Sequence, residues 1–142
     1  MSQEIIKKTG EIIAQNHSAP SYGVIALIDE HGHPTASTIS VAKNDGINWI
    51  TFCVGTDENK ANRIAKNNRA SVCFSSETYN ITLVGTAEIL TGQADKDEMW
   101  YDNCKHIWPE GPTSPDFAVL RFKTERYNIF GTVGEQHITG VL

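Results

Sequence analysis

The fold is decided by residues 47–70, which read INWITFCVGTDENKANRIAKNNRA. Residues 47–54 are rich in β-branched and aromatic side chains, a composition that predicts a strand. A glycine then breaks the run, and Thr56 or Asp57 is placed to cap a helix that begins near Glu58. The centre of the chain is therefore expected to be a strand that turns directly into a helix.

Lys60 lies in the first turn of that predicted helix. Unpaired backbone N–H groups at a helix start, together with a mobile cation, are suited to holding a phosphate group. The alternative is an ordinary exposed lysine on a surface helix. Asp57 and Glu58 favour this alternative, because they already complement the helix dipole and would repel a dianion.

The rest of the chain predicts a small antiparallel barrel in an α+β domain. Six strands are expected, at residues 22–28, 35–42, 47–54, 70–75, 79–90 (with Gly85 as a bulge) and 117–130. Besides the helix near Glu58, helices are expected at residues 4–16, interrupted by Gly10, and at 95–103, capped by Asp95. Residues 108–115 predict a rigid loop, and residues 131–142 a loose or partner-exchanging tail.

Composition limits the classes of function. A length of 142 residues fits one domain, here 1–142, and the net charge of −5 argues against nucleic acids and anionic membrane surfaces as partners. No apolar run reaches the length of about 20 residues that a membrane span needs, and the amino end lacks a signal-peptide core. These features predict a cytoplasmic protein. Cys53, Cys73 and Cys104 form an odd set without a Cys-x-x-Cys pair, which predicts free thiols rather than disulfides or zinc ligands.

Other chemical motifs are weak when taken alone. The pair His31 and His33 lies in a tight turn without a third ligand nearby in sequence, so a solvated turn is preferred to a metal site. Cys104 and His106 would pair a thiol with a base, but no motif supplies an orienting carboxylate or an oxyanion hole. The hydroxyls at 37–40 are, on their own, ordinary for a β-sheet.

Five short motifs in order resemble one family over about residues 4–130. They are the turn DEHGHP at 29–34, the strand WITFC at 49–53, Asn59-Lys60 with its helix, the strand VGTAEI at 84–89, and Met99-Trp100 followed by WPEG at 108–111. Together these motifs resemble the pyridoxamine 5'-phosphate oxidase-like flavin-binding split-barrel superfamily, in its general stress protein 26-like branch. The resemblance implies a mainly β, antiparallel six-stranded split β-barrel with peripheral helices.

The resemblance also implies a homodimer that binds two FMN molecules at the subunit interface. It places the cofactor beside Ser37, Thr38, Ile39, Ser40, Thr51, Phe52, Cys53, Asn59, Lys60, Asn80 and Trp108, with Lys60 and Asn59 at the phosphate and Trp108 reaching across from the second subunit. The implied function is that of a flavin-dependent oxidoreductase, stress-related by its branch, with an unidentified small-molecule substrate or electron donor. No residue stands out as an acid–base catalyst, because the cofactor carries the chemistry in this superfamily.

Two departures leave alternatives open. Many relatives carry an arginine at the position of Ser37 and a serine or threonine at that of Glu58, so this chain has a weaker expected phosphate site. The basic residues that hold substrate phosphate in true pyridoxamine phosphate oxidases are also not evident, which argues against that specific activity. The alternatives are a flavin carrier or sensor without turnover, a barrel that binds deazaflavin or haem, and a dimer with no ligand.

Overall fold

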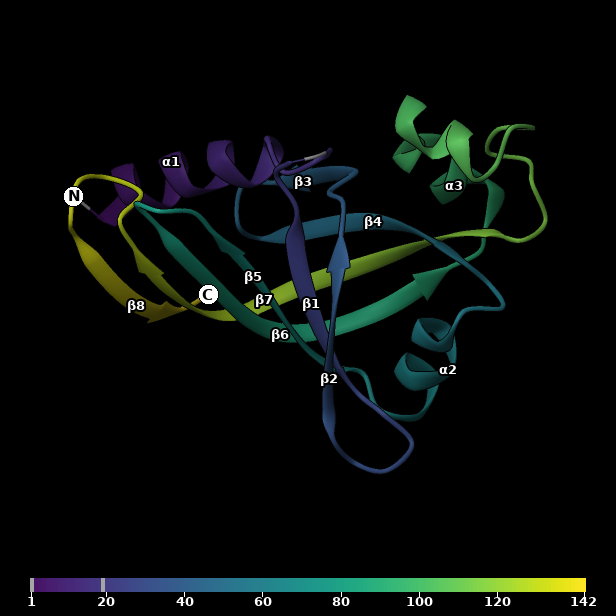
Figure 1. Cartoon of the computed structure of the whole chain (residues 1–142), viewed down its shortest axis with the longest axis horizontal. Helices are drawn as coiled ribbons and strands as arrows, with labels where there is room; N and C mark the ends of the chain where they lie inside the picture. The colour runs from purple at the N-terminus through teal and green to yellow at the C-terminus, as the bar shows by residue number, and fades with distance from the viewer. Residues whose placement is uncertain (1, 19) are drawn as a thin grey trace.

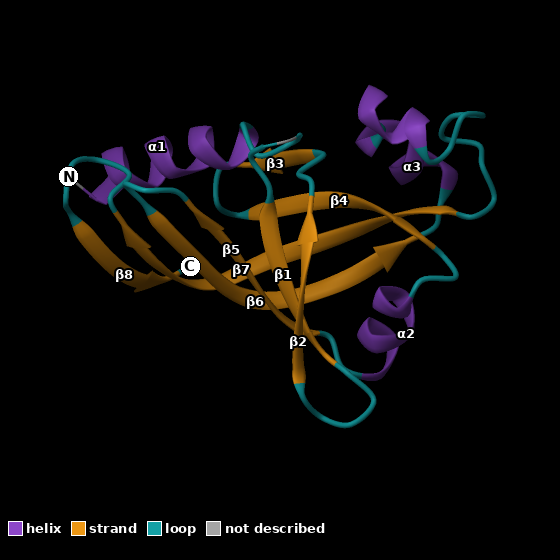
Figure 2. Ribbon diagram, viewed as in Figure 1, coloured by secondary structure: helices purple, strands orange, loops and turns teal. Residues whose placement is uncertain are grey.

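The computed structural model describes residues 2–18 and 20–142, and these form three α-helices, a short 3₁₀ helix and eight strands (Figure 1, Figure 2). In chain order the elements are α1 (Ser2–Ala14), β1 (Gly23–Ile28), β2 (Pro34–Ile39), β3 (Lys43–Asp45), β4 (Trp49–Gly55), α2 (Asn59–Lys66), β5 (Arg69–Ser75), β6 (Asn80–Leu90), α3 (Gln93–Met99), η1 (Asp102–His106), β7 (Phe117–Phe130) and β8 (His137–Val141).

All strand pairs are antiparallel, in the order β2-β1-β5-β6-β7-β4-β3, and β8 adds to β7. This arrangement confirms the expected mainly β, antiparallel α+β class. The strand number of six is too low, because it omits the short β3 and the C-terminal β8. Figure 1 shows α1 and β8 toward one end of the long axis and α2 and α3 toward the other.

Alternation along the strands builds the core. In β5 and β6 every second side chain is buried, including Val72, Phe74, Ile81 and Leu83. Such a period of two places one face of a strand inward and the other outward. The predicted irregularity at Gly85 is confirmed, since the register between β6 and β7 shifts between Val84 and Gly85.

Helix α1 runs through Gly10 without a break, so the expected interruption is wrong. A Cβ atom at Gly10 would lie 2.6 Å from Cα of Gly46, in the turn between β3 and β4. Glycine is present because the helix and this turn approach each other closely, and tertiary contact outweighs its poor helix propensity. Thr9 sits on the same buried side and donates a hydrogen bond to the Ile5 carbonyl at 2.7 Å.

Two helix predictions need correction at their ends. Helix α2 begins at Asn59, and Glu58 occupies the N-cap position without a side-chain cap hydrogen bond, so neither Thr56 nor Asp57 is the cap. The helix predicted at 95–103 is divided into α3 and η1, and its N-cap is Gly92 rather than Asp95.

The C-terminal tail, residues 131–142, contains a strand that pairs with β7 of the same chain. Residues of β8 pair with β7 from Arg126–Val141 to Phe130–His137, so the expectation of a loose tail is wrong. Glycines at 131 and 134 have positive φ values, which let the chain turn back onto β7. No helix among the described residues is both long and apolar enough to cross a membrane.

Candidate functional site

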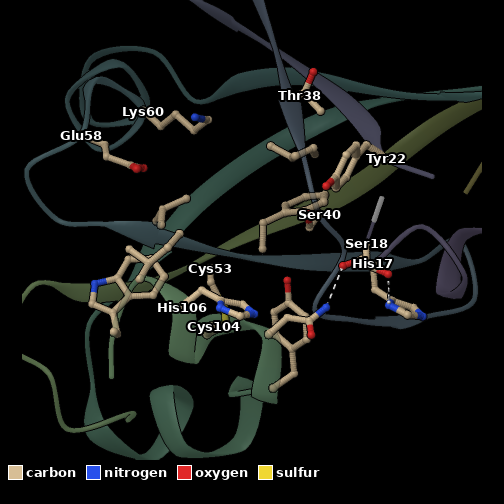
Figure 3. Close-up of a pocket in the computed structure, with 17 residues that line it drawn as sticks. His17, Ser18, Tyr22, Thr38, Ser40, Cys53, Glu58, Lys60, Cys104 and His106 are labelled. Carbon is tan, nitrogen blue, oxygen red and sulfur yellow. Dashed lines mark hydrogen bonds between the residues drawn. A yellow bond between two sulfur atoms is a disulfide. The ribbon is translucent and has the colours of Figure 1, made fainter. Parts of the chain in front are cut away.

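A large pocket with a volume of about 690 Å³ opens beside β2 and β4 (Figure 3). Ligand pockets for small molecules typically span about 300–1,000 Å³. Its lining comes from four places: the chain before β1, the strands β2 and β4, the start of α2, and the segment 101–108. The lining residues are His17, Ser18, Tyr22, Thr38, Ile39, Ser40, Phe52, Cys53, Val54, Glu58, Lys60, Tyr101, Asn103, Cys104, His106, Ile107 and Trp108.

One side of this pocket is an edge strand. Strand β2 stands first in the sheet order and pairs with β1 alone among the described strands. Its other edge therefore carries backbone N–H and C=O groups suited to a polar ligand rim. Thr38 and Ser40 add hydroxyls on this side, while Phe52 and Val54 of β4 give the pocket an apolar surface.

Charge gathers at the start of α2. Figure 3 shows Lys60 and Glu58 close together on the side of the pocket away from His17 and Ser18. Because Glu58 makes no side-chain cap hydrogen bond, the first N–H groups of α2 lack a capping side chain within the described structure. This end of the pocket combines a cation, helix N–H groups and one opposing carboxylate.

A second hollow of about 430 Å³ adjoins this end and shares Glu58 and Lys60 with the large pocket. Arg63, one helical turn after Lys60, also lines it. The Arg63 Nε atom is buried without a hydrogen-bond partner among the described residues, and Glu30 Oε2 lies 3.7 Å from it. Many relatives carry an arginine where this chain has Ser37. Here the Arg63 guanidinium lines the same hollow as Ser37.

Most predicted site residues lie around these two hollows. Seven line the large pocket: Thr38, Ile39, Ser40, Phe52, Cys53, Lys60 and Trp108. Ser37 and Asn59 line the adjoining hollow instead. The structure brings these nine side chains into one region, and their role in binding a cofactor stays a prediction.

Thr51 and Asn80 line neither hollow. The Thr51 hydroxyl is buried and bonds to the backbone of Lys43, accepting from its N–H at 3.1 Å and donating to its carbonyl at 3.3 Å. Asn80 begins β6, and its Oδ1 accepts a hydrogen bond from Thr82 at 3.2 Å. Neither side chain is directed into the pocket of its own chain.

Trp108 is a pocket residue and a core residue at the same time. Only 3% of its surface is exposed, and its ring lies 5.1 Å from that of Phe117 in the same chain. The structure therefore places Trp108 at the pocket of its own chain, whereas the resemblance implied a contribution from a second subunit.

The sequence did not predict several lining residues, most of them from irregular chain. Tyr22 and His17 lie around the turn before β1, and Tyr101 and Asn103 lie in or beside η1. Burial raises the pKa of Tyr101 above its ordinary value, and the Tyr22 phenol acts in the same direction, while a hydrogen bond with Ser40 opposes them. Tyr101 thus stays a neutral hydroxyl at physiological pH. Only the Cys104-Lys105-His106 motif pointed toward this segment.

Cys53 and Cys104 form a disulfide, so the prediction of three free thiols is wrong for this pair. Their Cα atoms are 6.7 Å apart, within the range that a disulfide spans. Their sequence separation of 51 conceals this proximity, because only the folded chain brings η1 against β4. Cys73 is free, as predicted. No group of three metal-ligating side chains occurs in the described ranges.

A family model described as pyridoxamine 5'-phosphate oxidase matches residues 10–130. Among curated proteins, no sequence matches the chain significantly. Solved structures share the fold. A protein related to general stress protein 26, of the pyridoxinephosphate oxidase family, from Clostridium acetobutylicum superposes with a TM-score of 0.83 at 24% identity, covering 100% of this chain and 97% of its own.

Two further solved structures are similar to this chain, and their names state different ligands. A pyridoxamine 5'-phosphate oxidase-related, FMN-binding protein from Nostoc punctiforme gives a TM-score of 0.69 at 14% identity, with coverage of 99% of this chain and 93% of its own. A haem-binding protein from Mycobacterium smegmatis gives 0.71 at 20% identity, with coverage of 96% and 57%. At these identities the comparisons establish the split-barrel fold.

Proposed function

Because the chain belongs to the pyridoxamine 5'-phosphate oxidase family, as the match over residues 10–130 shows, we propose that its large pocket binds FMN and that the protein is a flavin-dependent oxidoreductase. One observation carries this proposal. The pocket is apolar over β4, offers an unpaired strand edge along β2, and has a lysine at the start of a helix at its charged end. A flavin mononucleotide has the matching parts, namely a ring with a polar rim and a terminal phosphate.

The residues at the charged end fit a phosphate in part. Lys60 supplies the cation, and Ser37 and Arg63 in the adjoining hollow supply a hydroxyl and a second cation. Glu58 opposes them because it brings a negative charge to the same place. We infer a phosphate site of moderate affinity, in which Arg63 compensates for the absence of arginine at the position of Ser37.

When bound, the flavin would supply hydride or electron transfer, and the chain would supply binding and orientation. Thr38, Ser40 and the β2 backbone are suited to hold the polar rim of the ring. The neutral Tyr101 hydroxyl can donate a hydrogen bond to a ligand oxygen or nitrogen without adding charge. A small-molecule substrate and an electron donor would reach the ring from the open side of the pocket.

We also propose that two copies of the chain associate around this pocket. Tyr22 and Ile107 line it, and 41% and 69% of their surfaces are exposed. Apolar side chains at the rim of a ligand site are suited to being covered by a partner. Sedimentation velocity with and without FMN tests this part, and a monomer in both conditions would contradict it.

The central experiment is a fluorescence titration of the flavin-free protein with FMN and, in parallel, riboflavin. Lys60→Ala should weaken FMN binding by about 1.5–3 kcal/mol, the scale of a hydrogen bond to a charged group, and leave riboflavin binding unchanged. Lys66→Ala is the matched control, because Lys66 is an exposed lysine at the far end of the same helix and lines neither hollow.

Glu58→Gln extends the same experiment in the opposite direction. Removing the opposing charge should tighten FMN binding about two- to fivefold and again leave riboflavin unaffected. An unchanged FMN affinity in both variants would remove this end of the pocket from the phosphate role. No FMN binding at tens of micromolar would contradict the flavin proposal and leave deazaflavin, haem or no ligand.

Turnover separates an oxidoreductase from a carrier or sensor. NAD(P)H oxidation by the FMN-loaded protein, followed with added electron acceptors, should exceed the rate of free FMN at the same concentration. A rate no higher than that of free FMN would favour the carrier or sensor.

Haem is a second candidate, favoured by one specific observation. Two imidazoles, those of His17 and His106, line the large pocket, and histidine is a common axial ligand of haem iron. Hemin titration should then shift the Soret band in the wild type and not in His106→Ala, with His31→Ala as a control in an exposed turn. No Soret shift in the wild type would exclude haem.

A further inference from the structure

The Cys53–Cys104 disulfide joins two walls of the large pocket. Cys53 belongs to β4, and Cys104 belongs to η1, 51 residues later. Both residues line the pocket, and Figure 3 shows them side by side beneath its centre, next to His106. The bond is therefore part of the proposed ligand site rather than of the barrel interior.

The segment that this bond holds supplies much of the pocket. Six of the 17 lining residues lie within 101–108: Tyr101, Asn103, Cys104, His106, Ile107 and Trp108. We refer to residues 101–108 as the pocket wall. Any displacement of the pocket wall would change the shape of the site on the side facing β2 and α2.

Other connections of the pocket wall to the barrel are few. Its backbone hydrogen bonds are local, such as Cys104 N–H to the Tyr101 carbonyl at 3.0 Å and Trp108 N–H to the Cys104 carbonyl at 2.9 Å. Within the described residues, two hydrogen bonds link the pocket wall to distant segments. Asn103 Nδ2 donates to the His17 carbonyl at 3.2 Å, and Tyr101 is hydrogen-bonded with Ser40, just after β2. Trp108 packs on Phe117, but Ile107 is largely exposed. The disulfide is thus the covalent tie between η1 and β4, beside the apolar packing of the cluster that contains Cys104.

The arrangement also offers a reductant a route to the bond. Cys53 is partly exposed and faces the pocket, whereas Cys104 is buried. Attack on a disulfide sulfur by a thiolate requires such access. Cys73 lies on β5, lines neither hollow, and so remains a separate thiol that does not report on this bond.

We propose that the Cys53–Cys104 bond is a redox-modification site at which thiol compounds control the affinity of the pocket for its ligand. The Sγ–Sγ bond breaks as a dithiol donates two electrons and two protons, giving Cys53 and Cys104 thiols and the disulfide of the reductant. The pocket wall then loses its covalent tie to β4, and the pocket loses its shape. The part of this proposal that concerns ligand affinity rests on the proposed function of the pocket.

The first test needs no ligand. Alkylation under denaturing conditions followed by intact mass measurement should find one free thiol in the untreated protein and three after dithiothreitol treatment. Hydrogen exchange should then be faster at 101–108 in the reduced protein and unchanged in β5 and β6. Three free thiols in the untreated protein, or identical exchange at 101–108 in both states, would overturn the proposal.

The second test measures affinity. Reduced protein and the Cys53→Ser/Cys104→Ser double variant should both bind FMN about tenfold more weakly than the oxidised protein, a coupling within the usual range for linked sites. Cys73→Ser is the matched control, and its affinity should still depend on dithiothreitol. FMN affinity equal in both redox states would overturn the control of affinity while leaving the proposed function intact.

The two proposals can fail separately. If FMN binds in neither redox state, the proposed function fails, and the exchange data alone decide whether the disulfide restrains the pocket wall. If FMN binds equally to the double variant and the wild type, the redox control fails although the flavin site stands.

Discussion

The described residues form two apolar clusters that are held together in different ways. The larger cluster fills the barrel, with side chains from β1, β2, β4, β5, β6, β7 and α1. The smaller cluster consists of Met99, Cys104, Trp108, Phe117 and Val119, and two of these, Cys104 and Trp108, belong to the pocket wall. Strand β7 serves both clusters, because Phe117 and Val119 belong to the smaller cluster, whereas Ala118, Leu120 and Phe122, which alternate with them, belong to the larger.

The larger cluster is stabilised by regular structure. Its strands alternate buried and exposed side chains, and continuous ladders of hydrogen bonds join them. The smaller cluster lies under irregular chain and depends on a few specific ties, including the Cys53–Cys104 disulfide and the buried Lys96. Segments with few buried contacts open more readily than core strands, and binding sites are often built from them. The comparison predicts a rigid barrel with a pocket wall of lower local stability.

The largest expected effect is in the barrel. Phe122 is fully buried in the larger cluster, and Phe122→Ala should lower the free energy of unfolding by about 3–5 kcal/mol, as measured by urea denaturation. Phe130→Ala, on the same strand but 42% exposed, is the matched control and should cost less than about 1 kcal/mol. Similar losses for both variants would mean that the barrel is not the dominant source of stability.

Lys96 provides a smaller and more local effect. It is 6% exposed, its Nζ donates to the Ser114 carbonyl at 2.9 Å, and the Nζ atom lies 5.6 Å from the centre of the Phe117 ring. Lys96→Met would keep an unbranched apolar stem in place of the lysine stem but leave the buried Ser114 carbonyl without its donor. We expect the free energy of local opening at 101–116 to fall by about 1–2 kcal/mol, measured by hydrogen exchange.

Global unfolding tests whether that effect is local. For Lys96→Met the free energy of unfolding should change by no more than about 0.5 kcal/mol, and the exposed Lys105→Met should change neither quantity. An equal fall in local and global stability would show that the two clusters form one cooperative unit, and the comparison would fail.

The same difference explains what the sequence could predict. The strand at 117–130 is predicted with both ends correct, because its alternation and its length need no knowledge of the rest of the fold. The start of α2 beside Lys60 is also close to its true position, since composition changes sharply after Gly55. Local pattern therefore defines the barrel and the charged end of the pocket.

The pocket wall could not be predicted in this way. Its residues form a 3₁₀ helix that no hydrophobic period marks, and its disulfide joins positions 51 residues apart. For a related reason, the sequence could not show that the Thr51 side chain lies outside the pocket. Its hydroxyl is hydrogen-bonded to the backbone of Lys43, a contact that only the hairpin of β3 and β4 creates. The place of Arg63, whose Nε atom has no hydrogen-bond partner among the described residues, likewise emerges only from the fold, which brings it and Ser37 to the same hollow.

The smallest expected effect is a pH dependence of the free energy of unfolding, which arises from Asp29 in the barrel and not from the pocket wall. Hydrogen bonds to the Asp29 carboxylate lower its pKa to about 2, from the ordinary value of 3.8. The largest contribution comes from the His33 N–H, which donates at 3.0 Å. Thr35 Oγ1 and the His31 N–H also donate to the carboxylate, each at 2.9 Å. A lowered pKa means that the folded state binds the proton less readily than the unfolded state does. The resulting stability is complete above pH 3.8 and is lost as the pH falls toward 2.

Asp29→Asn should therefore be less stable than the wild type at about pH 5, and the difference in unfolding free energy should shrink toward zero by about pH 2. Urea denaturation across this range measures it, with Glu77→Gln as a control carboxylate in another exposed hairpin turn. Hydrogen exchange at 101–108 should not follow the same titration, because the Asp29 hydrogen bonds lie within the turn between β1 and β2, and the smaller cluster contains no residue of that turn. If the pocket wall loosens together with the Asp29 turn, the two regions share one stability and the barrel does not act as an independent scaffold.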